Sequence, residues 1–197
     1  CGPSPTLTRS YWQAKYDQEQ TGWDRGNASP TLLRWLAAGE LRPCRILVPG
    51  CGRGHEVVAL AKAGFDVTGV DFAPAAVAAV QSRLASEGLT AEVVESDLFA
   101  YQPDRPFEAI YEQTCLCALP PDRWGEYEKR LAGWLTRGGR LFAAFMQTDS
   151  ADGPPFTCLP DAMRRLFAAE EWEWPDQLEP QEHPNGLIEL TGVLRRW

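Results

Sequence analysis

The fold is decided by one stretch of the chain, Arg45-Ile-Leu-Val-Pro-Gly-Cys-Gly-Arg-Gly54. A short apolar run ends there at a Gly-x-Gly-x-Gly turn, and the apolar residues that follow it recur at helical spacing, which predicts a strand, a tight turn and a helix. The glycines permit positive φ and close approach of a ligand, and the new helix directs free N–H groups toward the turn. A second apolar run ends at Asp71. Because an acidic residue about 20 residues after such a turn binds ribose hydroxyls in Rossmann-type sites, the stretch indicates a nucleoside ligand.

The spacing of the glycines discriminates among nucleoside-binding proteins. A dinucleotide fingerprint has the form G-x-G-x-x-G. Here the glycines are Gly50, Gly52 and Gly54, with His55 in the next position, and no Lys-Ser/Thr pair follows as a P-loop requires. The compact turn resembles motif I of the class I S-adenosylmethionine (SAM) methyltransferases, whose ligand carries no phosphate.

Composition limits the class of protein. A chain of 197 residues with 44% hydrophobic and 23% charged residues is typical of one globular domain. The formal net charge of -8 disfavours nucleic acid as a partner, because such binding depends on neutralisation of phosphates by Lys and Arg. No long apolar run predicts a transmembrane helix, and the first 30 residues show no apolar region typical of a signal peptide. We therefore expect a cytoplasmic protein.

Cysteine and histidine could indicate disulfides or a metal, but their spacing favours neither. The six cysteines include no C-x-x-C pair, and two of them are expected in one strand, so we predict reduced, structural thiols. We predict that His55 and His183 lie on the surface and that no metal is bound. The cysteines are Cys1, Cys44, Cys51, Cys115, Cys117 and Cys158.

Strands and helices are predicted to alternate along most of the chain. Ser29 and Pro30 predict a helix start, as N-cap and first helical residue. The pattern predicts an α/β, Rossmann-like fold with a mostly parallel seven-stranded sheet, helices on both faces and an antiparallel C-terminal hairpin. Residues 1–40 are expected to form an N-terminal helical cap or lid, and residues 41–197 the core of a single domain. The predicted strands are 46–48, 66–71, 91–95, 107–112, 140–147 and two terminal ones, of which the last is 187–195, with helices between the earlier strands and at 161–168.

Acidic residues occur at three successive strand ends, where ligands of open α/β sheets bind. Asp71 is predicted to accept from the ribose hydroxyls and Asp97 from an adenine amino group, with Phe72 and Leu98 on either side of the ring. Glu112 is placed where the ammonium group of a methionine moiety would lie. Each carboxylate alone could be a solvated loop residue, but the three together favour a binding site.

Three aromatic residues, Trp12, Tyr16 and Trp23, precede the sheet and flank a glycine-punctuated loop. An aromatic face attracts a cation more strongly when water is excluded, and SAM carries a sulfonium. We therefore predict that these residues form a lid. The alternative is an amphipathic helix packed on the core.

The motifs together resemble the thiopurine S-methyltransferase family, and within it the bacterial members and the plant thiol and halide methyltransferases. The resemblance extends from Trp12 to the last strand. It implies a class I methyltransferase that binds SAM and releases S-adenosylhomocysteine (SAH), with Trp12, Tyr16 and Trp23 covering the cofactor. Many members have tryptophan at the middle position and aspartate in place of Glu112. The motifs are Trp12-x3-Tyr16-x6-Trp23-Asp24-x-Gly26, Val48-Pro-Gly-Cys-Gly-x-Gly-His55, Gly69-Val-Asp71 and Gly153-Pro-Pro-Phe156.

The predicted reaction is methyl transfer to a small soft acceptor: a thiol or thiopurine, a halide, or an oxyanion of selenium or tellurium. Such acceptors need no protein nucleophile, and no catalytic base is assigned. Methylation of nucleic-acid amino groups would require a Pro-Pro-aromatic motif directly after the fourth strand, where the chain reads Glu112-Gln-Thr-Cys-Leu116. We expect a monomer that acts on a small molecule. The alternatives are a SAM-binding protein without catalysis and a nicotinamide-dependent oxidoreductase.

Overall fold

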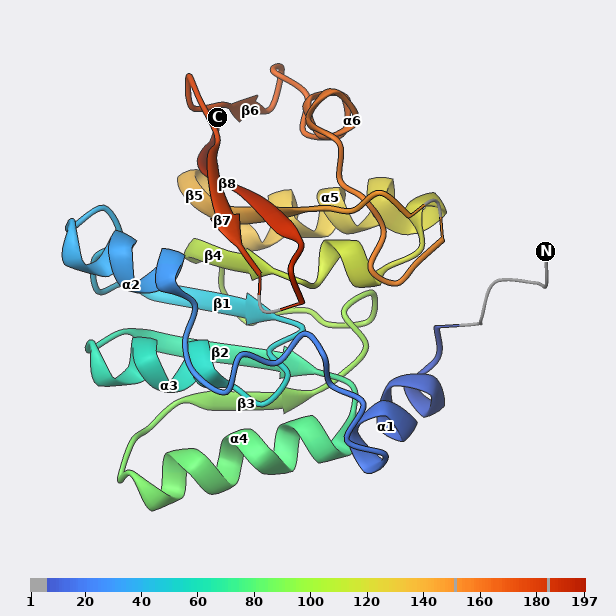
Figure 1. The fold of residues 1–197 in the computed structure, drawn as a ribbon. Helices are drawn as coiled ribbons and strands as arrows, with labels where there is room; N and C mark the ends of the chain where they lie inside the picture. Colours follow the sequence, from blue (N-terminus) through green and yellow to red (C-terminus); the bar gives the residue numbers. More distant parts are fainter. Residues whose placement is uncertain (1–6, 151, 184) are drawn as a thin grey trace.

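The computed structural model describes residues 7–150, 152–183 and 185–197. They form a mixed sheet of eight strands in the order β3-β2-β1-β4-β5-β8-β6, with β7 also paired to β8 (Figure 1). The strands are β1 (Arg45–Pro49), β2 (Asp66–Asp71), β3 (Glu92–Glu95), β4 (Phe107–Gln113), β5 (Leu135–Gln147), β6 (Trp172–Glu173), β7 (Glu179–Glu182) and β8 (Ile188–Arg196).

Helices cover both faces of the parallel part of the sheet, as predicted. Along β1, Ile46 and Val48 pack in one apolar cluster with α2, α3 and α4, and Leu47 packs in the other with α5 and α6. This division follows from the alternation of side chains along a strand. The helices are α1 (Arg9–Asp17), α2 (Pro30–Ala37), α3 (His55–Lys62), α4 (Pro74–Ser86), α5 (Trp124–Trp134) and α6 (Pro160–Leu166), with the short 3-10 helices η1 (Leu116–Ala118) and η2 (Pro121–Arg123).

The start of α2 is as predicted: Pro30 is its first residue, and the side chain of Ser29 accepts from the backbone N–H of Thr31.

The C-terminal part is antiparallel, as predicted, but it contains one strand more than expected. β8 pairs with β5 from Arg140 to Gln147 and with β7 along its other edge. The additional strand is β6, whose two residues pair with the end of β8 through Trp172 and Arg196. A pair of this length leaves no periodic signal in the sequence.

Two boundaries differ from the prediction. β5 begins at Leu135 rather than at residue 140, because the register between β4 and β5 shifts and residues 136–139 bulge out of the ladder. Gly138, at φ +76°, lies in this bulge. Cys115 and Cys117 do not lie in a strand, because β4 ends at Gln113 and Cys117 belongs to η1.

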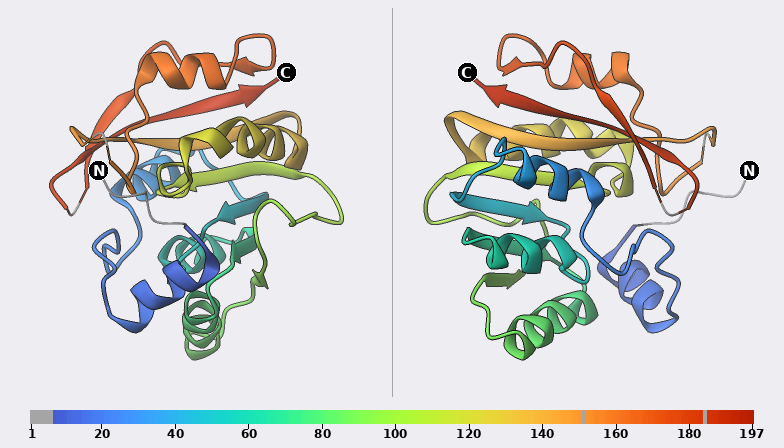
Figure 2. Two further views of the ribbon diagram at one scale, coloured as in Figure 1. Left: turned by 90° about the vertical axis from the view of Figure 1, so that its right-hand side faces the viewer. Right: turned by 60° about the vertical axis from the view of Figure 1, so that its left-hand side comes forward.

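The N-terminal segment turns back over the carboxyl ends of the strands. α1 lies beside the ends of β2 and β3 and contacts α4, and the following loop crosses toward α2 (Figures 1 and 2). We call residues 9–26 the lid segment. Residues 1–6 of the expected cap lie outside the described residues. None of the helices seen in the described ranges combines the length and apolar character needed to span a membrane.

Candidate functional site

A cavity of about 780 Å³ lies between the lid segment and the carboxyl ends of the strands. Its size is in the range of small-molecule sites. The structure brings most of the predicted site residues to this cavity. Those that line it are Trp12, Tyr16, Trp23, Gly50, Gly52, Asp71, Phe72, Asp97 and Leu98.

Asp71 connects the second strand to the glycine turn. One carboxylate oxygen accepts from the backbone N–H of Gly52 at 3.0 Å, and the other accepts from the N–H of Ala73 at 2.9 Å. Burial raises the pKa of Asp71 above its ordinary value, and the backbone hydrogen bonds oppose this rise. A carboxylate offers about four lone-pair sites, so acceptor capacity toward the cavity remains.

The glycine turn leaves space that side chains would fill. Gly50 has φ +58°, and a Cβ there would lie 2.8 Å from the sulfur of Cys115. At Gly52, with φ +52°, a Cβ would lie 3.2 Å from the hydroxyl oxygen of Tyr16. The turn therefore depends on glycine for both conformation and space. Gly54 does not line the cavity; it packs against Val80, which a Cβ would approach to 2.6 Å.

Glu112 is also absent from the lining of the cavity. Its side chain, on the opposite face of β4 from Tyr111 and Gln113, accepts from the N–H of Leu116 at 2.6 Å. It is 2% exposed, and burial raises its pKa to about 8. This position does not support the predicted contact of Glu112 with an ammonium group.

The third strand end supplies Asp97 and Leu98. Asp97 is exposed, and one of its oxygens accepts from the N–H of Phe99 at 2.9 Å. Leu98 and Phe72 are half-buried and line the cavity. The other oxygen of Asp97 has no protein donor among the described residues and is available to a ligand.

The three aromatic residues of the lid segment form one cluster. The ring of Trp23 meets Trp12 edge-on at 5.5 Å between centroids and Tyr16 at 5.9 Å. All three line the cavity, and burial together with nearby Asp71 raises the pKa of Tyr16. The cluster therefore covers the glycine turn with apolar surface.

The lid segment is joined to the glycine turn through Asp24 and His55. One oxygen of Asp24 contacts Nε2 of His55 at 2.7 Å and accepts from the N–H of Gly26 at 2.7 Å. The guanidinium of Arg83 lies against Nδ1 of His55 and can only donate, so Nε2 donates to Asp24. Arg53 adds an ion pair to Asp24 at 3.5 Å.

Both histidines differ from the prediction of surface positions. The side chain of His55 is 12% exposed because it is held between Asp24 and Arg83. His183 is 3% exposed because the turn between β7 and β8 packs against the lid loop. Both burials depend on contacts between segments far apart in the sequence, so hydropathy could not indicate them.

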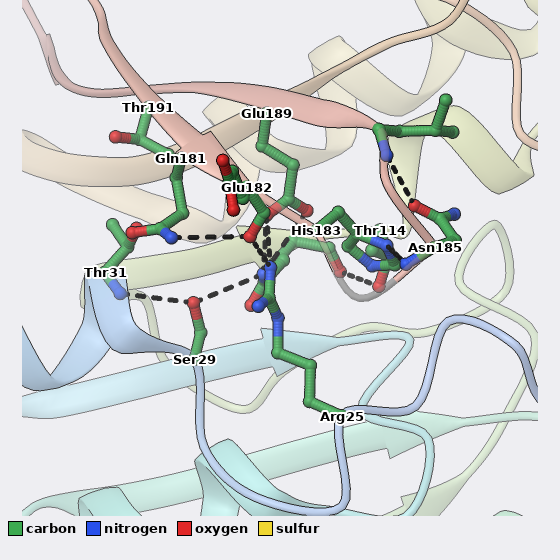
Figure 3. Close-up of polar contacts among 12 residues, drawn as sticks. Arg25, Ser29, Thr31, Thr114, Gln181, Glu182, His183, Asn185, Glu189 and Thr191 are labelled. Atoms are coloured by element: carbon green, nitrogen blue, oxygen red, sulfur yellow. Dashed lines mark hydrogen bonds and ion pairs between the residues drawn. The ribbon is translucent and has the colours of Figure 1, made fainter.

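Several cavity residues were missed by the sequence reasoning. Arg25, Gln113, His183 and Asn185 form one side of the cavity, which we call the polar wall. Figure 3 shows Arg25 reaching from the lid loop to the turn between β7 and β8. The signal that could have identified Gln113 is its position as the last residue of a strand.

The cysteines described by the structure are free thiols: Cys44, Cys51, Cys115, Cys117 and Cys158. Cys1 lies outside the described residues. Within the described parts of the chain, no group of three His, Cys, Asp or Glu side chains is arranged to hold a metal ion.

The model of the thiopurine S-methyltransferase family matches residues 7–191. The chain belongs to the thiopurine S-methyltransferase family. This match includes the lid segment, the glycine turn and the polar wall. The predicted activity, methyl transfer that depends on SAM, and the predicted class I methyltransferase fold are confirmed.

Similar proteins occur in plants and bacteria. The chain is 30% identical over 154 residues to thiocyanate methyltransferase 1 of Arabidopsis thaliana, covering 77% of this chain and 68% of the plant protein. It is 30% identical over 207 residues to a thiopurine S-methyltransferase of Methylococcus capsulatus, covering 92% and 93% of the two chains. The fold is similar to that of the 1,6-didemethyltoxoflavin-N1-methyltransferase of Burkholderia thailandensis, solved with SAH, with a TM-score of 0.76, 23% identity, and coverage of 96% and 87%.

Proposed function

We propose that the chain methylates a small, soft nucleophile: a thiol or thiopurine, a halide or thiocyanate, or an oxyanion of selenium or tellurium. The observation that carries this proposal is the cavity in which the glycine turn, Asp71 and the aromatic cluster meet under the lid segment. The plant and bacterial relatives, named for thiocyanate and thiopurine, support this acceptor class.

The residues of the cavity fit SAM. Gly50 and Gly52 keep the turn open to a ligand, and Asp71 offers acceptor sites beside it. We propose that Asp71 binds the ribose hydroxyls and Asp97 the adenine amino group, as the sequence predicts. Phe72 and Leu98 would hold the ring, and the lid aromatics would cover the remainder. Gly54 and Glu112 would act through the packing of the turn, because neither reaches the cavity.

When bound, SAM supplies a methyl group on a sulfonium, which an acceptor takes with its own electron pair while the pair of the broken carbon–sulfur bond stays on sulfur. The protein holds SAM and the acceptor in position and excludes water from them. The lid segment covers the strand ends, so the displacement takes place away from bulk water. The aromatic cluster of Trp12, Tyr16 and Trp23 faces the cavity. Its rings would attract the positively charged sulfonium of SAM.

We further propose that the protein acts in a reducing compartment such as the cytoplasm, as a monomer without a nucleic-acid partner. The five cysteines that the structure describes are free thiols, which supports a reducing compartment, and the net charge of -8 opposes binding to a polyanion. Size-exclusion chromatography with light scattering measures the oligomeric state.

Calorimetry followed by an acceptor screen tests the proposed function. SAM and SAH should bind and NAD should not. With methyl-labelled SAM, label should appear in iodide, thiocyanate, thiols or chalcogen oxyanions. Binding of SAM without label in any small acceptor would contradict the proposal, as would label that appears only in DNA, RNA or protein.

A further inference from the structure

The polar wall contains an arginine that none of the proposed cofactor contacts uses. One nitrogen of the Arg25 guanidinium, Nη2, donates to the backbone oxygen of Glu182 at 2.8 Å and contacts Glu189 at 3.3 Å (Figure 3). The side chains of Arg25 and Glu189 are 12% and 0% exposed. One side of the guanidinium is therefore fixed to the turn between β7 and β8, while Arg25 also lines the cavity.

The Nε–H group of Arg25 has no such partner. It is buried, and no acceptor for it exists among the described residues. A buried donor without an acceptor is costly, and such groups are rare in native proteins. An acceptor supplied by a ligand would remove this cost.

His183 presents a second donor of the same kind. It is 3% exposed and lines the cavity, and its Nδ1 accepts from the backbone N–H of Asn185 at 3.5 Å. Burial and the charge of Arg25 lower the pKa of His183, so the ring is neutral and carries its hydrogen on Nε2. Nε2 is buried without an acceptor among the described residues.

The acidic residues nearby already have protein donors. Glu189 accepts from the side-chain amide of Gln113 at 3.0 Å in addition to its contact with Arg25. Glu56 accepts from the backbone N–H of Ser29 at 3.0 Å, and burial raises the pKa of both acids. Glu189 therefore links Arg25 to Gln113 of the wall, whereas Glu56 binds the segment before α2. The buried donors of Arg25 and His183 have no acceptor among the described residues.

We propose that Arg25 and His183 bind the methyl acceptor as an anion and thereby determine the specificity of the cavity for anionic acceptors. This inference rests on the proposed function and narrows its substrate class. A soft anion such as iodide, thiocyanate or a thiolate accepts hydrogen bonds from two donors and needs no donor in return. It also loses no proton before it takes the methyl group, which agrees with a cavity to which no catalytic base is assigned.

Binding and kinetics of two variants test the proposal. In Arg25→Gln, the Kd of thiocyanate for the SAH complex and the KM of iodide should rise by roughly tenfold or more, the scale of a hydrogen bond to a charged group. In His183→Phe, which keeps a ring of similar shape, both should rise roughly threefold to tenfold. The Kd of SAH should change by less than the Kd of thiocyanate in both variants, and circular dichroism should show that the variants fold.

The control is Arg34→Gln. Arg34 donates to Thr191 on the same strand as Glu189 but does not line the cavity, so its loss should leave the Kd of thiocyanate unchanged. Dimethyl sulfide, a neutral acceptor, serves as the second control: it should be a poor substrate of the wild type, and its rate of methylation should not fall in Arg25→Gln.

A third variant separates binding of an anion from a structural role of Arg25. Glu189→Gln removes the carboxylate that partly neutralises Arg25, so thiocyanate should bind more tightly. Unchanged thiocyanate affinity in both Arg25→Gln and Glu189→Gln would overturn the proposal. Methylation of dimethyl sulfide but of no anion by the wild-type protein would also overturn it, and would leave methyl transfer to a soft acceptor intact.

Discussion

Asp71 has two roles, and both depend on its carboxylate. Its carboxylate fixes the glycine turn through the N–H groups of Gly52 and Ala73, and it borders the cavity. Asp71→Ala should weaken the binding of SAM and of SAH by at least ~1.5 kcal/mol, the scale of a hydrogen bond to a charged group. Calorimetry measures both. Asp66→Ala, at the exposed start of the same strand, is the control and should bind both ligands normally.

Glu112 belongs to the core, and its burial has a consequence for stability. Its pKa in the folded protein is about 8, above its ordinary value of 4.5. Between these values the folded state holds a proton that the unfolded state releases, so stability falls as pH rises through this interval. In Glu112→Gln the side chain stays neutral, and its oxygen can still accept from the N–H of Leu116.

Urea unfolding at pH 5 and pH 8 measures this effect. Wild type and Glu112→Gln should be similar at pH 5, and the variant should be more stable by a few kcal/mol at pH 8. The exposed Glu179→Gln should show no such difference. A wild-type protein and Glu112→Gln with parallel pH dependence would contradict the role of burial.

At the scale of elements, β4 shows where sequence reasoning reaches its limit. The strand was predicted from its apolar residues, but Ala109, Ile110, Tyr111 and Glu112 are all buried. With both faces covered, no alternation of apolar and polar residues indicates which side chains face the cavity. A shift by one residue moves every side chain to the opposite face of the sheet. The sequence analysis assigned Glu112 to the site, whereas Gln113 lines the cavity.

The lid segment was predicted from three aromatic residues, and its connection to the glycine turn was not. Asp24 and His55 are 31 positions apart and their contact depends on tertiary structure. The structure therefore connects two of the four motifs of the resemblance, the one that ends at Gly26 and the one that ends at His55. The Trp-Asp-x-Gly motif supplies the carboxylate of Asp24, which accepts from the N–H of Gly26. His55, after the glycines, donates to the same carboxylate.

The aromatic cluster gives a prediction at this scale. If Trp23 stabilises the sulfonium, Trp23→Ala should weaken the binding of SAM by about 1–2 kcal/mol. It should weaken the binding of SAH by less, because SAH lacks that charge. Calorimetry of both ligands gives the difference. Trp197→Ala, at an exposed tryptophan far along the chain, should change neither affinity. Equal losses for SAM and SAH would limit the role of Trp23 to packing.

Across the whole molecule, the parallel part of the sheet was predictable and the C-terminal part less so. Each parallel strand carries an apolar run, such as Ile46–Val48, and the runs of β2, β3 and β4 end at an acid. β7, with the sequence Glu-Pro-Gln-Glu, is largely exposed and has no apolar pattern. Its turn nevertheless brings His183 to the cavity. The residues proposed to bind the cofactor could thus be predicted from the sequence, and those of the polar wall could not.

Opening of the lid relative to the core gives the last prediction. The lid segment is attached mostly through polar contacts: the hydrogen bonds of Asp24, those of Arg25 to the turn between β7 and β8 and to Glu189, the ion pair of Arg9 with Glu95, and the N–H of Ala75, which donates to Gln13. No residue of α1 is buried. Segments with few buried apolar contacts open at lower free energy than the core. Amides of residues 9–26 should therefore exchange hydrogen faster than those of α3 and β1, and SAH should slow them, because a ligand that binds the closed form stabilises it.

Asp24→Ala removes the hydrogen bond to His55 that connects the lid segment to the glycine turn. Amides of residues 9–26 should therefore exchange hydrogen faster than in the wild type, while amides of α3 and β1 exchange at unchanged rates. Asp17→Ala, an acid on α1 whose described hydrogen bond is to Gln13 of the same helix, is the matched control. Hydrogen exchange measured by mass spectrometry distinguishes the segments. If residues 9–26 exchange as slowly as β1 in the free protein, or if SAH leaves their rate unchanged, the segment is a fixed part of the core and does not close over the cofactor.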